Sequence, residues 1–152
     1  MKPLLYFVAL FIFSLSTSSL GIAQTGPNNA AKLITEATQG LLNNTKGRYK
    51  DKEFDAVIEY EASAIDLNGD GQPEVFTKRY GGMFGQAGVE INLYIKNKKG
   101  DWKPQFGFPG DYKILPTMSK GYPDIEIRGP GKCFPIWRWN GQVYDLWKNC
   151  RP

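Results

Sequence analysis

Residues 57–80, VIEYEASAIDLNGDGQPEVFTKRY, decide the fold, because two runs of strand-forming residues flank a loop of turn-forming residues. The runs 57–65 and 75–80 are rich in Val, Ile, Tyr and Phe, which are favoured in β-strands. The Asp, Asn and Gly residues between them favour a turn. This stretch therefore predicts two adjacent strands joined by a polar loop.

Further strands are predicted on the C-terminal side of this pair. Residues Val89, Ile91, Leu93 and Ile95 alternate with polar residues, which is typical of a half-buried strand. Strands are also expected near 102–106 and 125–128, whereas the Gly- and Pro-containing segment 107–121 is expected to be mostly loop.

The last segment is predicted to form a hairpin, because residues 133–139 and 142–147 flank an Asn-Gly pair. Asn-Gly is preferred in the two-residue type I′ turn. That turn would place Trp139 opposite Gln142, Trp137 opposite Tyr144, and Cys133 opposite Lys148.

On the N-terminal side, residues 27–42 are predicted to form one amphipathic helix, followed by a charged connector at 48–55. The apolar residues of the helix recur at helical spacing; they are Ala30, Leu33, Ile34, Ala37, Leu41 and Leu42. The expected fold class is α+β, mainly antiparallel β, with small sandwich-like or propeller-like sheets and one N-terminal helix.

The first 23 residues are predicted to be a signal peptide. Lys2 precedes the apolar run 4–13, and Gly21-Ile22-Ala23 is a small-x-small cleavage pattern. An uncleaved anchor is the alternative, although the apolar run is shorter than the roughly 20 residues of a membrane-spanning helix. We therefore expect one calcium-loop β-rich domain, 24–152, in the periplasm or secreted and not spanning a membrane.

The charge and composition exclude several functions. Removing residues 1–23 takes one of the 19 basic residues and none of the 15 acidic ones, leaving a net charge of +3. This charge is scattered, so no nucleic-acid binding is expected. The chain contains no His, which removes His-based catalysis and His-ligated zinc. Its two Cys, Cys133 and Cys150, are expected to form a disulfide in an exported chain.

The loop 66–74 is the motif with the most specific chemistry. Side-chain oxygens of Asp66, Asn68 and Asp70 fall on alternate residues, the carbonyl oxygen of Gln72 can add a fourth ligand, and Glu74 supplies another carboxylate. Calcium takes six to eight hard oxygen ligands in flexible geometry. The loop therefore predicts one structural Ca²⁺ site, and the alternative is an ordinary turn rich in Asn, Asp and Gly.

This loop resembles the Asp-x-Asp-x-Asp-Gly-x-x-Asp calcium loops of FG-GAP-type β repeats, with Asn68 and Glu74 as departures. Its first six residues also match the EF-hand pattern. Position 12 is Thr77 instead of Glu, and the flanking segments are predicted strands instead of helices. The resemblance covers some 20 residues and implies calcium binding between two strands.

Two further features have a functional and a structural interpretation. In the Gly-rich segment 81–88, residues Met83, Phe84, Gly85 and Gln86 could form a finger that inserts into a protein partner, or Phe84 could fold back onto the core. The Trp and Tyr residues of the C-terminal hairpin could form a sugar-stacking platform, or they could belong to the core and the sheet surface.

The combination of signal peptide, Asp-rich loop and Cys-closed aromatic hairpin resembles small bacterial periplasmic proteins, among them immunity proteins for wall-degrading type VI secretion effectors. This resemblance implies an exported, non-catalytic protein that binds or inhibits a protein partner such as a wall-degrading effector or hydrolase. It implies that residues 83–86 match the plugging loop. A cell-wall or carbohydrate-binding module is the alternative, and an enzyme is less favoured because no nucleophile–base set is evident.

Overall fold

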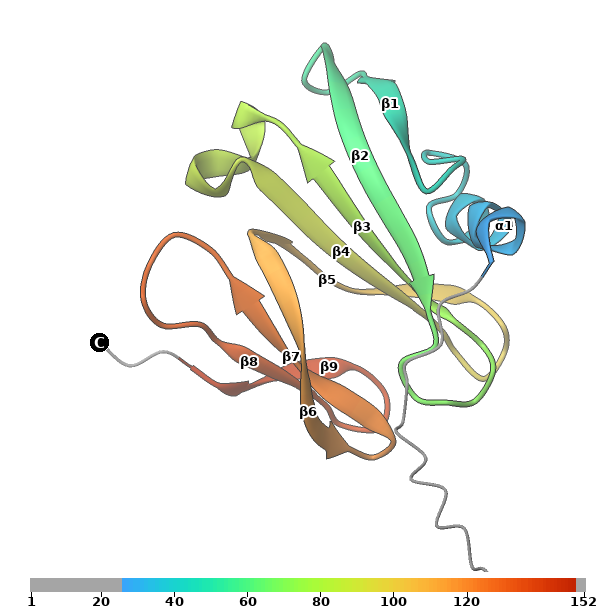
Figure 1. The fold of residues 1–152 in the computed structure, drawn as a ribbon, viewed down its shortest axis with the longest axis vertical. Coiled ribbons are helices and arrows are strands. Elements are labelled where there is room, and N and C mark those ends of the chain that lie inside the picture. Colours follow the sequence, from blue (N-terminus) through green and yellow to red (C-terminus); the bar gives the residue numbers. More distant parts are fainter. Residues whose placement is uncertain (1–25, 150–152) are drawn as a thin grey trace, which may run out of the picture.

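The computed structural model describes residues 26–149. Within them, one α-helix and nine strands form three layers, in which the helix and a four-stranded sheet lie on opposite faces of a five-stranded sheet (Figure 1). The prediction of a mainly antiparallel β protein with one N-terminal α-helix is confirmed. The predicted signal peptide, 1–23, and Cys150 lie outside the described residues.

The first sheet, called sheet A, is an antiparallel meander in chain order. It contains β1 (Lys46–Asp51), β2 (Ala56–Ile65), β3 (Glu74–Tyr80), β4 (Val89–Lys96) and β5 (Trp102–Pro109). A short 3₁₀ segment, η1 (Gly82–Ala87), joins β3 to β4. The second sheet, called sheet B, contains β6 (Asp111–Ser119), β7 (Tyr122–Arg128), β8 (Ile136–Trp139) and β9 (Tyr144–Lys148), again in chain order.

Alternation along β3 and β4 divides the hydrophobic core into two parts. Phe76 and Leu93 face sheet B and pack with Ile125 of β7, whereas Val75 faces the other way, toward the helix. The helix α1 (Pro27–Ala37) packs its buried Ile34 on that second face. Both faces of the central strands of sheet A are thus removed from water, which favours folding by apolar burial.

The chain passes from sheet A to sheet B at Gly110. This residue has φ +136°, and a Cβ there would lie 2.1 Å from the carbonyl oxygen of Arg128. Its N–H donates a hydrogen bond of 2.8 Å to the carbonyl oxygen of Val89. Only glycine fits this position, because any side chain would both strain the backbone and collide with β7.

Two predicted loops proved to be strands. The charged connector forms β1, an edge strand in which Lys46 pairs with Glu61 at 3.6 Å and Arg48 with Glu59 at 2.6 Å across to β2. The segment 107–121 contains β6, which is the edge strand of sheet B. Edge strands need only one buried face and tolerate charged residues and Pro, so their sequences resemble loops.

The predicted register of the C-terminal hairpin was wrong. Trp139 lies opposite Tyr144, and Ile136 lies opposite Lys148, with an irregularity between Ile136 and Trp137. The turn spans four residues, because the Asn140 side-chain oxygen accepts hydrogen bonds from the backbone N–H groups of Gln142 and Val143, at 2.8 and 3.0 Å. An Asn side chain can replace a backbone turn in this way.

Substitution Gly110→Ala is expected to destabilise the protein by about 2 kcal/mol or more, because it adds a Cβ where the backbone is left-handed and the Arg128 carbonyl is in contact. Urea unfolding followed by circular dichroism measures this change. The matched control is Gly129→Ala, whose Cβ would lie 4.0 Å from its nearest neighbour and should change the free energy of unfolding by less than about 0.5 kcal/mol. Equal effects of the two substitutions would contradict the role assigned to Gly110.

Candidate functional site

The loop 66–73 leaves the end of β2 and returns at the start of β3, at the bottom of sheet A in Figure 1. Gly69 and Gly71 adopt left-handed conformations, with φ of +74° and +84°. Glycine adopts such angles without steric cost, and the two residues therefore let the loop wind tightly enough to bring alternate side chains together.

Side-chain oxygens of the loop accept hydrogen bonds from its own backbone. Asp66 Oδ1 and Oδ2 accept from the N–H groups of Gly69 and Gly71, at 2.8 and 2.9 Å. Asn68 Oδ1 accepts from the N–H of Asp70 at 2.9 Å, and Asp70 Oδ1 accepts from the N–H of Gln72 at 2.7 Å. An ionised carboxylate has about four acceptor positions, so Asp66 and Asp70 keep acceptor capacity for a further ligand.

Glu74 connects this loop to sheet B. Its side chain lies at the buried start of β3, only 3% exposed. Its Oε2 accepts from the Leu67 N–H at 2.8 Å, and its Oε1 accepts from the Tyr122 hydroxyl at 3.0 Å. Burial raises the pKa of Glu74 to about 7; the hydrogen bonds from Leu67 and Tyr122 oppose this, and the negative charge of Asp70 adds to it.

Four of the five predicted ligands lie in the loop 66–73 and the fifth, Glu74, begins β3, but their carboxylates are not arranged as a preformed metal cage. Among residues 26–149, no group of three His, Cys, Asp or Glu side chains is arranged to hold a metal ion. The donors of the loop are all oxygens, which fits the chemistry of calcium. Thr77, at EF-hand position 12, is buried within β3. Calcium binding therefore stays a prediction.

The predicted partner-binding residues lie in and beside η1, with different exposure. Phe84 is 5% exposed and packs against the Phe54 ring, with centroids 6.0 Å apart, and under the Arg79 guanidinium. Of the two alternatives for Phe84, the structure thus shows the folded-back one. Met83, 36% exposed, lies at the surface together with Gly85 and Gln86, and their binding to a partner stays a prediction.

Most aromatic residues of the C-terminal hairpin belong to the core between the sheets. Trp139 and Tyr144 are 9% and 2% exposed, and Trp137 packs against Phe108 with ring centroids 4.8 Å apart. Trp147 is 43% exposed, but the Arg138 guanidinium lies 3.1 Å from its ring centroid. These positions leave no open row of aromatic faces on the hairpin for a sugar to stack on.

The predicted disulfide joins Cys133, in the segment before β8, to Cys150. Cys150 lies outside the described part of the chain. The observed register brings Ile136 opposite Lys148, so the predicted position of Cys133 opposite Lys148 was wrong. The pairing itself stays a prediction.

A shallow groove lies on the exposed face of β1–β3 and beside β6. It consists of two adjoining hollows of about 330 and 490 Å³, which share Lys46 and Glu61 as lining residues. Tyr80 also donates a hydrogen bond to Glu61, at 2.9 Å, and burial together with this carboxylate raises the pKa of Tyr80 to about 12. The ion pairs Lys46–Glu61 and Arg48–Glu59, which connect β1 and β2, cancel most of the charge in this groove.

The sequence did not indicate a polar cluster on the outer face of sheet B, which is the face that points away from sheet A. Asp124, fully buried, accepts two hydrogen bonds from Arg138, at 2.9 and 2.7 Å, and one from Thr117 at 2.6 Å. The hydrogen bonds from Arg138 lower the pKa of Asp124. In the sequence, Asp124 is simply the polar member of an alternating strand, which predicts an exposed side chain.

The chain matches no protein-family model, no curated protein and no solved structure. Within residues 26–149, no helix has both the length and the apolar character needed to cross a membrane.

Substitution Tyr122→Phe removes the hydroxyl that connects β7 to Glu74, and it is expected to lower the free energy of unfolding by about 1–2 kcal/mol because a buried acceptor loses a partner. Chemical denaturation measures the change. Tyr80→Phe is the control, since its hydroxyl meets the exposed Glu61, and it should cost less than about 0.5 kcal/mol. If Tyr122→Phe leaves the free energy of unfolding unchanged, this hydrogen bond does not stabilise the packing of the two sheets.

Proposed function

We propose that the protein is an exported, non-catalytic binding protein, that its β2–β3 loop holds one structural calcium ion, and that it binds or inhibits another protein. The observation that carries the calcium part is a single short segment, wound by the left-handed Gly69 and Gly71, that supplies the carboxylates of Asp66, Asp70 and the buried Glu74. Burial disfavours the charged form of Glu74, and a divalent cation next to it would favour that form.

In this proposal the ligands are the side chains of Asp66, Asn68, Asp70 and Glu74 and the carbonyl oxygen of Gln72, with waters completing the shell. The loop joins two adjacent strands of one sheet, and this position supports a structural role for the ion. Calcium would neutralise three carboxylates that otherwise repel one another, and Glu74 would transmit this stabilisation to Tyr122 in sheet B.

Export is proposed from the sequence of residues 1–23 and from the two Cys residues. An extracellular or periplasmic location supplies an oxidising environment for Cys133 and Cys150. It also offers calcium at concentrations that a site lacking the twelfth-position Glu can use, since extracellular modules bind calcium with Kd of about 10⁻⁴–10⁻³ M. The absence of His from the whole sequence supports binding instead of catalysis.

The η1 connection supports protein binding as the activity. Met83 is exposed at 36%, and Phe54 of the neighbouring β1–β2 turn is exposed at 42%. Contact between the Phe54 and Phe84 rings holds the two loops together. Because this contact holds the exposed Met83 and Phe54 side chains in place, they can enter a cleft of a partner with little loss of conformational entropy.

Calcium is expected to raise the midpoint of thermal unfolding, and EDTA to lower it. At a free calcium concentration 100-fold above Kd, the stabilisation should be about 2.7 kcal/mol. The Asp66→Asn/Asp70→Asn double variant should lose this response. Asp101→Asn, an acid in the β4–β5 turn, is the control and should keep it. An unchanged midpoint in the unsubstituted protein would refute the calcium site.

The partner is expected to be a wall-degrading effector or hydrolase encoded beside this protein. Co-purification with the unsubstituted protein would identify the partner. Met83→Asp should then weaken the complex about tenfold, which corresponds to about 1.4 kcal/mol, because the substitution introduces a charge among the apolar side chains of η1. Isothermal titration calorimetry measures the affinity, and Leu41→Asp, at an exposed apolar position after α1 (47% exposed, compared with 36% for Met83), is the control. Full affinity of the Met83 variant would exclude the η1 segment from the interface.

A further inference from the structure

The face of sheet B that points away from sheet A carries a row of side chains across all four strands. Lys113 of β6 lies opposite Glu126 of β7, Glu126 lies opposite Ile136 of β8, and Ile136 lies opposite Lys148 of β9. Residues opposite one another in adjacent strands share a face. Since Ile125 and Ile127 face the core, this row faces outward.

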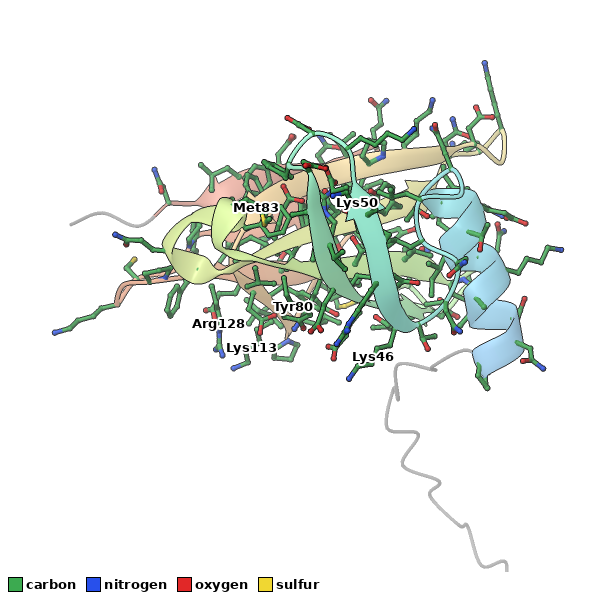
Figure 2. All side chains as sticks on the ribbon, turned by 90° about the horizontal axis from the view of Figure 1, so that it is seen from above. Lys46, Lys50, Tyr80, Met83, Lys113 and Arg128 are labelled. Carbon is green, nitrogen blue, oxygen red and sulfur yellow. The ribbon has the colours of Figure 1, made fainter. Side chains whose placement is uncertain are left out.

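Two carboxylates of this outer face, Asp124 and Glu126, are covered by cations, whereas Asp111, opposite Arg128, and Asp145, opposite Arg138, are exposed. The Asp124 side chain is fully buried, and the Glu126 side chain is 21% exposed, compared with 44% for Arg128. Arg138 covers Asp124, and Arg128 binds Glu126 at 2.7 Å. Lys113 and Lys148 form no ion pair with any residue of 26–149, so their charges are not neutralised within the described chain. Figure 2 shows Lys113 and Arg128 next to each other on one side of the molecule.

Trp147 contacts two of these cations. Its ring lies 3.1 Å from the Arg138 guanidinium carbon and 4.1 Å from Lys148 Nζ, both measured to the ring centroid. The two hydrogen bonds from Arg138 to Asp124 fix the guanidinium in place. Trp and Arg are the residues that most often dominate binding energy in protein interfaces, and here both are ordered before any partner arrives.

The two sheets also differ in net charge. Residues 26–110 contain eleven basic and eleven acidic residues, whereas residues 111–149 contain six basic and four acidic residues. The excess positive charge of the described chain therefore belongs to the sheet B part. Of the four acids there, Asp124 pairs with Arg138, Glu126 with Arg128 and Asp111 with Lys78 of β3, which leaves Lys113 and Lys148 without a carboxylate partner among residues 26–149.

The geometry points to the outer face of sheet B, formed by Lys113, Arg128, Arg138, Trp147 and Lys148, as a docking surface for a carboxylate-rich face of a protein partner. This inference rests on the proposed function, since it names the chemistry of the partner. It assigns a second contact region, distinct from η1. Carboxylates of the partner bind Lys113, Arg128 and Lys148, and an apolar residue between them covers the exposed edge of the Trp147 indole.

A carboxylate-rich protein surface fits this face better than a lipid surface does. The face is a sheet four strands wide, about 14 Å across at the usual strand spacing, and its anchors are one indole and one fixed guanidinium. Ile136, the aliphatic member of the row, is half-buried, and the exposed Leu146 of β9 lies opposite the core-facing Trp137 instead of on the outer face. Planar, bidentate recognition by Arg suits carboxylates on a defined surface.

The test uses the purified isotope-labelled protein in calcium, with poly-L-glutamate as the carboxylate probe and phosphatidylglycerol vesicles as the lipid probe. Poly-L-glutamate should shift the backbone amide resonances of Lys113, Arg128 and Lys148 and the indole resonance of Trp147, and its affinity should fall with salt. Lys113→Glu/Lys148→Glu should weaken binding about tenfold. Lys98→Glu/Lys99→Glu, the same charge change at the exposed β4–β5 turn, should weaken it less than about twofold.

Equal weakening by the two double variants, shifts scattered over both sheets, or tighter binding to the vesicles than to poly-L-glutamate would overturn the docking surface. The co-purified partner separates this inference from the proposed function. If the partner binds the unsubstituted protein and Lys113→Glu/Lys148→Glu binds it with unchanged affinity, protein binding stands and the outer face of sheet B is excluded. If the partner does not bind at all, the proposed function fails. The poly-L-glutamate measurement still shows whether the outer face of sheet B binds carboxylates.

Discussion

The three-layer arrangement depends on the backbone at Gly110, where the chain leaves one sheet and begins the other. The Arg128 carbonyl lies where a Cβ would be, so β5 and β6 can change direction only without a side chain at this point. The change of direction turns sheet B back onto sheet A and encloses the apolar side chains between them. The hydrogen bond between Glu74 and Tyr122 also joins the sheets, at the polar end of the same core.

The sequence indicated the central strands well and the edges poorly. In β4, strict alternation predicted both the strand and its buried face, because that strand has one face toward sheet B. In β1, Arg48, part of the predicted connector, is the cross-strand partner of Glu59. In the last hairpin, hydrogen bonds to the Asn140 side chain accompany a four-residue turn. The Asn-Gly pair alone does not predict the length of that turn, and the predicted register was therefore wrong.

The candidate loop could be located from residue spacing, and the surroundings of its ligands could not. The pattern 66–74 identified which oxygens lie in the loop. It carried no sign that Glu74 would be buried or that Tyr122, 48 positions away, would bind it. Likewise, alternation placed Asp124 on the outer face of sheet B, but only the fold brings Arg138 and Thr117 over it. Such pairings depend on the order of strands, and local patterns do not encode that order.

The distribution of the four tryptophans has a spectroscopic consequence. Trp102 contacts Lys96 and the helix residue Glu36, Trp137 and Trp139 lie between the sheets, and Trp147 is on the outside of sheet B. Each boundary between layers therefore contains its own indole chromophore, in surroundings of different polarity. Detachment of the helix, separation of the sheets and contact at the outer surface would each change the emission of a different ring, so single-tryptophan versions of the chain could resolve the order in which its layers open.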